Sequence, residues 1–309
     1  MPRQISVTCS DSVTSEIINK IEKMEGIIEI NLYRNASYKP QGDIIKISVM
    51  NRSLFPLMRI LDQFQPGEES GISVFTSEPD GCIVSNYKVQ NDTSEALWEE
   101  MEFIISKDSN ANSTTLAIMA LSGILATIGL YLNALHIVIA GMLIAPGFMP
   151  ITRIALGFVT GNKIWQRGII DTFKCYLALM IAAGMTSMIF KLNNTDPLSN
   201  IESYYDINKS LISFWTEITF ISLATSSIAG TAGALLLATK RSVFTSGVMI
   251  GLALIPASTL IPISLLSGDY ILASKALTRF SLDVIITFVF SFIVLIIEQK
   301  RIHKRSLKV

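Results

Sequence analysis

From Thr115 onward the chain carries six apolar segments, each long enough to cross a membrane as a helix. A hydrocarbon core of about 30 Å needs roughly 20 helical residues. Only 16% of the residues are charged, whereas soluble domains usually have about a quarter. The sequence therefore predicts an α-helical polytopic membrane domain over residues 114–300. We place its spans near residues 115–132, 134–160, 168–190, 211–239, 243–267 and 277–297.

The charge differs between the two halves of the chain. Residues 1–113 hold 17 acidic and 10 basic side chains, and residues 114–309 hold 8 acidic and 15 basic ones. The N-terminus has no apolar signal segment, so we expect the first half to stay in the cytosol. Its acidity argues against nucleic acid or anionic lipid as its partner.

Loop charges predict the orientation of the spans. If the chain starts inside, the cytoplasmic connections contain Lys163 with Arg167, Lys240 with Arg241, and the basic tail 301–309. This is the positive-inside pattern. We therefore expect a multi-pass protein of the plasma membrane with both termini in the cytosol.

Short alternating and helical runs follow one another in residues 1–90. Their order is βαββαβ, which predicts an α+β ferredoxin-like cytoplasmic domain. Such a domain could bind a small regulatory ligand, or serve only for packing and oligomerisation. Residues 91–113 read as an amphipathic connector helix and linker, which would pack on this domain or lie at the membrane surface.

The membrane half resembles itself when it is shifted by 110 residues. Gly141 then falls on Gly251, and Pro146 falls on Pro256. After a two-residue slip, one basic and acidic helix start overlies another, with Lys163, Arg167 and Asp171 on Lys275, Arg279 and Asp283. If the repeats, near 115–190 and 225–300, have three spans each, they cross in opposite directions. Such an inverted 3+3 repeat is typical of many secondary transporters.

The stretch ATIGLYLNALHIVIAGMLIAPGFMPITRIALGFVTGN, followed by WQRG, is similar to the signature of a prokaryotic membrane family, domain of unknown function 389. In that family, a G-L-x-x-(Asn/Asp) stretch leads into a helix rich in glycine and methionine, and then into two prolines. This chain departs from the pattern at PGFMP and at His136. The resemblance implies a multi-span membrane domain with a cytoplasmic N-terminal part, and it implies no reaction.

Prolines interrupt two corresponding spans, at Pro146 and Pro150 and at Pro256 and Pro262. Matched breaks indicate a midplane binding site, and Arg153 in the first turn after a break would favour an anion. The alternative is that the prolines only kink two packed helices. The predicted substrate path comprises Asn133, Gly141, Pro146, Pro150, Arg153, Glu217, Gly251, Pro256 and Pro262.

Charged residues near the span ends have two readings. They could gate a path or attract a solute, or they could snorkel to the surface and form (i, i+4) pairs. We expect Glu217 to face inward or to be paired, and we expect the partner of Arg153 to come from another helix, solvent or a ligand. The predicted gating or interfacial charges are Lys163, Arg167, Asp171, Lys275, Arg279 and Asp283.

Two function classes remain open. The first is a transporter or channel-like protein for an unknown, possibly anionic, solute, regulated by the cytoplasmic domain. The second is a membrane-anchored sensor or scaffold without transport. Three cysteines and two histidines offer no metal-ligand spacing, so we expect no enzyme, metal or cofactor. The expected partners are membrane lipid, further copies of the chain and a small solute or ion.

Overall fold

The computed structural model describes residues 3–64, 72–77, 98–161, 163–192, 211–238 and 254–301. The chain divides into two compact units. The N-terminal unit comprises residues 1–97 with 303–309, and the membrane unit comprises residues 98–302.

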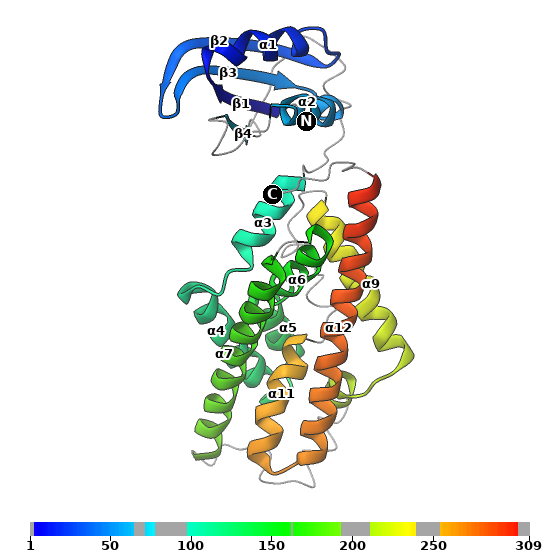
Figure 1. Cartoon of the computed structure of the whole chain (residues 1–309). Coiled ribbons are helices and arrows are strands. Elements are labelled where there is room, and N and C mark those ends of the chain that lie inside the picture. The colour runs from blue at the N-terminus through cyan, green and yellow to red at the C-terminus, as the bar shows by residue number, and fades with distance from the viewer. Residues whose placement is uncertain are drawn as a thin grey trace. The chain divides into compact units, whose positions relative to one another are not determined.

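The N-terminal unit holds a four-stranded antiparallel sheet and two helices (Figure 1). The elements are β1 (Arg3–Cys9), α1 (Asp11–Ile21), β2 (Ile27–Tyr38), β3 (Gln41–Val49), α2 (Asn51–Asp62) and β4 (Ser73–Ser77). The strand order is β2-β3-β1-β4. The predicted order βαββαβ is therefore confirmed, and it is that of a ferredoxin-like sandwich.

Alternation along the strands builds the core of this unit. Ile5, Val7 and Cys9 of β1 are buried together, and so are the helix residues Ile17 and Leu57. In a strand, every second side chain points to the same face, so one face of the sheet packs against α1 and α2. Tyr33 and Phe75 lie on the opposite face and are exposed among the described residues.

The membrane unit consists of helices. They are α3 (Trp98–Asp108), α4 (Ser113–Tyr131), α5 (Leu135–Ile144), α6 (Phe148–Thr160), α7 (Ile164–Leu192), α9 (Phe220–Ala238), α11 (Leu254–Ser267) and α12 (Tyr270–Arg301). Residues 211–216 form a further short helical stretch. The connector predicted in residues 91–113 contains α3, which buries Met101 and Ile105 and packs on α6 and α9.

Four described helices, α4, α7, α9 and α12, are long and apolar enough to cross a membrane. The pair α5 and α6 makes a fifth candidate span, bent by 42° at its break. The six predicted spans are therefore seen only in part. The expected span 211–239 is a continuous helix only from Phe220, and of the expected span 243–267 the structure describes α11 alone.

Contacts between helix ends show how the membrane unit is arranged (Figure 1). Tyr131 at the end of α4 shares a 2.6 Å hydrogen bond with Ser187 near the end of α7. Lys191, also near the end of α7, donates to the Leu266 carbonyl at the end of α11. The ends of α4, α7 and α11 therefore lie at the same end of the unit, next to the start of α12.

Candidate functional site

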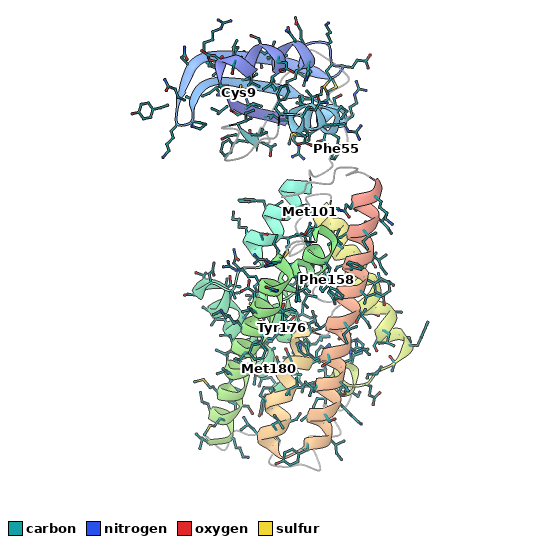
Figure 2. The ribbon with its side chains drawn as sticks, viewed as in Figure 1. Cys9, Phe55, Met101, Phe158, Tyr176 and Met180 are labelled. Atoms are coloured by element: carbon teal, nitrogen blue, oxygen red, sulfur yellow. The ribbon has the colours of Figure 1, made fainter. Side chains whose placement is uncertain are left out.

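The break between α5 and α6 is buried within the helix bundle. Ala145, Gly147 and Phe148 are buried, and Tyr176 of α7 donates to the Gly147 carbonyl at 3.3 Å. A Cβ on Gly147 would lie 3.5 Å from Ile255 in the first turn of α11. A side chain of another helix thus hydrogen-bonds to the backbone at the break, and a broken helix at membrane depth needs such protein contacts. Figure 2 shows Tyr176 among the packed helices.

The four prolines occupy different helical positions. Pro146 lies in the break itself, and Pro150 and Pro256 are each the third residue of a helix, α6 and α11 respectively. A proline in the first turn removes no intrahelical hydrogen bond. Residues 239–253 before α11 lie outside the described residues, so the match of Pro146 with Pro256 stays a prediction. Pro262 alone lies in a helix interior.

The partner of Arg153 comes from another helix. Its Nη1 donates to Asp171 Oδ2 on α7 at 3.1 Å, to Asn110 Oδ1 at 2.9 Å and to Ser109 Oγ at 3.1 Å. Arg153 and Asp171 are both buried. All three bonds use Nη1, whereas Arg153 Nε has no hydrogen-bond partner in the described part of the chain, so the anion site expected there stays a prediction.

Arg167 and Arg279 differ although they are matched in the repeat. Arg167 is exposed, and its Nε lies 4.0 Å from Asp171. Arg279 is buried and lies 3.1 Å from Asp283, while Ser222 and Ser226 of α9 accept hydrogen bonds from its guanidinium. The interpretation that both arginines snorkel at the surface is therefore wrong for Arg279.

A column of polar residues continues from this pair along α12. Arg279, Asp283, Thr287 and Ser291 recur every fourth residue and are all buried, and we call them the polar stripe. Arg279 Nε and Asp283 Oδ2 lie 3.1 Å apart as an ion pair. Thr287 Oγ1 and Ser291 Oγ lack a hydrogen-bond partner in the described part of the chain. At 1.5 Å per residue the stripe extends for about 18 Å, more than half of a hydrocarbon core.

The α9 helix faces this stripe. Ser226 Oγ donates to Asp283 Oδ1 at 2.8 Å. Further along, a Cβ on Gly230 would lie 3.4 Å from the Thr287 Cα, so the two backbones approach closely there. The stripe thus lies along the α9–α12 contact.

Comparison with known proteins finds a family whose model matches part of the membrane unit. Residues 142–289 match the domain of unknown function 389 (DUF389). This match begins in α5 and ends within α12, so it includes the break, Arg153 and most of the polar stripe. The chain is also 24% identical over 271 residues to an uncharacterized protein of Methanocaldococcus jannaschii, covering 87% of this chain and 79% of the relative. No solved structure matches.

The other residues predicted for the path either support the packing of helices or lie outside the helices. Asn133 ends α4 with a positive φ of 51°, a conformation that asparagine tolerates at a helix end. Gly141 lies against the α4 backbone, and its carbonyl accepts from Ser122 at 2.7 Å. Glu217 is exposed in the connection before α9, so the expected inward-facing position is wrong. Gly251 lies outside the described residues.

The remaining predicted charges, Lys163 and Lys275, lie at opposite ends of the membrane unit. Lys163 and Lys275 are exposed, as surface snorkelling predicts. They line separate cavities, one with Arg167 and Asp171 and the other with Glu217. Among the described residues, no three histidine, cysteine, aspartate or glutamate side chains are grouped so that they could hold a metal ion.

The polar stripe was not predicted from the sequence, although a signal for it exists. Thr287 and Ser291 read as ordinary members of an apolar span, because hydroxyl side chains are common in membrane helices. Their spacing of four from Arg279 and Asp283 places all four residues on one helix face. The face of α9 that contacts these residues carries Ser222 and Ser226.

The N-terminal unit has a smaller polar cluster where β1 ends. The backbone amide of Asn35 donates to Asp43 at 2.8 Å and lowers the pKa of that carboxyl. A hydrogen bond with Asp43 raises the pKa of Asp11. Burial raises the pKa of the Cys9 thiol, so Cys9 is a weak nucleophile and its role is structural.

Proposed function

We propose that the membrane unit moves a small hydrophilic solute or ion across the membrane, and that the polar stripe forms part of its path. The observation that carries this proposal is the pair of buried hydroxyls of Thr287 and Ser291 on α12, which have no hydrogen-bond partner in the described residues and follow the buried ion pair of Arg279 and Asp283. Ionisable residues within membrane segments are expensive and usually serve a function. The expected role of the N-terminal unit is regulation of this path.

The hydroxyls of the stripe differ from other hydroxyls in the same unit. Many helical serine and threonine side chains here donate to the backbone carbonyl four residues earlier, among them Thr127, Thr152, Thr172, Thr186, Thr231 and Thr259. Thr287 and Ser291 make no such bond in the described structure. Leaving a buried hydroxyl unpaired costs about 1–3 kcal/mol, so water or a passing solute is the natural partner.

The chemistry of the stripe favours an electrically neutral path lined with oxygen atoms. Asp283 and Arg279 offset each other, and the hydroxyls beyond them both donate and accept hydrogen bonds. Protons, water and small cations suit such ligands better than the anion that Arg153 suggested.

Opposed helix directions support an inverted repeat as the frame of this path. The helix α4 ends where α7 ends, whereas Ser222 in the first turn of α9 lies beside the third turn of α12. The helices α6 and α11 begin close together at Gly147 and Ile255 and end at opposite ends of the unit. We propose that α4, α6 and α7 correspond to α9, α11 and α12, in a six-span protein of the plasma membrane with cytosolic termini.

The alternative, a sensor or scaffold, has one observation in its favour. Among the described residues, the face of the N-terminal sheet opposite α1 and α2 exposes Tyr33 and Phe75, with Lys46 over the Tyr33 ring at 5.4 Å. Exposed aromatic side chains are common where proteins bind partners. A protein that binds a partner through this face and carries no flux would fit this alternative.

Flux through liposomes tests the proposal. Purified protein is reconstituted, and trapped fluorescent dyes report entry of H⁺, K⁺ and Cl⁻ under an imposed potential. The double variant Thr287→Val with Ser291→Ala should slow the flux by roughly tenfold or more, since losing an oxygen partner costs about 1–3 kcal/mol and 1.4 kcal/mol is a factor of ten.

Thr278→Val is the matched control on the same helix, because its exposed hydroxyl bonds back to the Ser274 carbonyl. It should keep the wild-type rate. The proposal fails if none of the three ions enters faster than in protein-free liposomes, or if the double variant and the wild type carry equal flux.

A further inference from the structure

A cavity of about 630 Å³ opens between the α3–α4 connection and the start of α7. Its polar lining includes Asn110, Asn112, Lys163, Arg167, Asp171 and Lys174. Binding sites for small ligands usually measure about 300–1,000 Å³, so this cavity could hold one.

The cavity carries an excess of positive charge. Lys163 lies immediately before α7, and Arg167 and Lys174 follow one face of that helix seven residues apart. Neither lysine has an ionic partner in the described part of the chain. Asp171 already accepts from Arg153 at 3.1 Å, while Arg167 remains 4.0 Å away and exposed. Asp171, the only carboxylate that lines the cavity, is thus neutralised by Arg153, which does not line it.

The two asparagines add neutral donors. Asn110 Oδ1 accepts from Arg153 at 2.9 Å, and Asn112 Oδ1 accepts from the Thr115 amide at 2.8 Å. Each oxygen is occupied, which leaves the amide nitrogens as donors toward the cavity. Together with Gln166 and Asp171, the lining thus offers three cationic side chains and two amide donors, and such donors recognise an oxyanion, phosphate above all.

The position of the cavity indicates the source of that phosphate. The helix α7 has 29 residues and is about 43 Å long, which exceeds a 30 Å hydrocarbon core by about nine residues. The start of α7, which follows Lys163 and carries Arg167 and Lys174, can therefore extend to the headgroup level. Basic pockets between membrane helices on the cytoplasmic side are suited to anionic headgroups.

We propose that this cavity binds the phosphate of an anionic phospholipid headgroup in the cytoplasmic leaflet. The occupant would join α7 to the α3–α4 connection, next to the buried pair of Arg153 and Asp171. This binding site is independent of whether the polar stripe carries a solute.

A second cavity at the opposite end of the membrane unit provides an internal comparison. It measures about 300 Å³ and is lined by Thr216, Glu217, Asp269 and Lys275 among others. Two carboxylates against one amine should repel a phosphate. The headgroup site is therefore expected at one membrane surface only.

Thermal unfolding of the full-length protein in a neutral detergent tests the proposal. The added probes are dioctanoyl phosphatidylglycerol, dioctanoyl phosphatidylcholine and inorganic phosphate, each titrated separately. A ligand that binds only the folded protein raises the unfolding temperature as its concentration rises. We expect a saturable rise with the phosphatidylglycerol, and little change with the other two.

The double variant Lys163→Gln with Lys174→Gln should need roughly tenfold more phosphatidylglycerol for the same rise. Both lysines are exposed, so the variant should fold. Lys275→Gln, in the second cavity, is the matched control and should respond as the wild type does.

Three results would overturn the proposal. Equal shifts with phosphatidylcholine, or an unchanged response of the double variant, would show that the cations do not select the headgroup. A full shift with inorganic phosphate alone would replace the lipid by a free anion. No shift with any probe would leave the cavity without a phosphate ligand.

Discussion

Arg153→Gln is expected to lower the free energy of unfolding of the membrane unit by about 3–5 kcal/mol. The reason is that Asp171 is buried and would keep its negative charge without the guanidinium 3.1 Å away. Ser109 and Asn110 would lose their bonds to the same arginine. Denaturant titration of the purified protein in mixed micelles, followed by circular dichroism, measures the change.

Two variants give this prediction its controls. Arg167→Gln removes an exposed partner at 4.0 Å and should cost less than about 1 kcal/mol. Adding Asp171→Asn to Arg153→Gln removes the orphaned charge, so the double variant should be more stable than Arg153→Gln alone. If Arg153→Gln alone is as stable as the wild type, the buried pair does not exist in solution.

The close contact between α4 and α7 predicts the second large effect. A Cβ on Gly123 would lie 2.5 Å from the backbone oxygen of Leu179, which cannot move without shifting the helix. Gly123→Ala should therefore destabilise the unit by about 1–3 kcal/mol, even though alanine favours helix. The same micelle titration measures it.

Gly184→Ala on α7 is the matched control. Its Cβ would meet the side chains of Pro262 at 3.4 Å and Leu266 at 4.0 Å, which are ordinary contacts. This variant should be neutral or more stable by up to about 1 kcal/mol, because alanine has the higher helix propensity. Equal effects of the two alanines would contradict the packing of α4 on α7.

Local patterns were enough to predict the N-terminal unit. Alternation in β1 and β3 and the helical period of α1 lie within short stretches, so each element could be read alone. The match to DUF389 was likewise recognisable from the glycine and proline spacing around Pro146 and is confirmed. Both features depend on residues that are close in sequence.

Contacts between helices could not be predicted in the same way. Arg153 on α6 pairs with Asp171 on α7, which lies 18 positions further along the chain. No rule of sequence spacing indicates such a pair. Arg279 resembles Arg167 in its motif, yet α12 begins nine residues before it at Tyr270, so Arg279 lies deeper and against α9. The depth of a charge depends on where its helix starts, and the repeat comparison did not contain that information.

Aqueous access to the polar stripe tests the central claim of this account most directly. Thr287→Cys and Ser291→Cys are made singly after the native cysteines, Cys9, Cys82 and Cys175, are replaced by alanine. The reconstituted proteins are exposed to a charged, membrane-impermeant thiol reagent. Ala126→Cys, within the buried apolar core, is the control.

The account predicts that the cysteines at positions 287 and 291 react with the reagent much faster than the cysteine at position 126, because water reaches the stripe. Reaction at neither position, or at the same slow rate as the control, would contradict a hydrophilic path along α12.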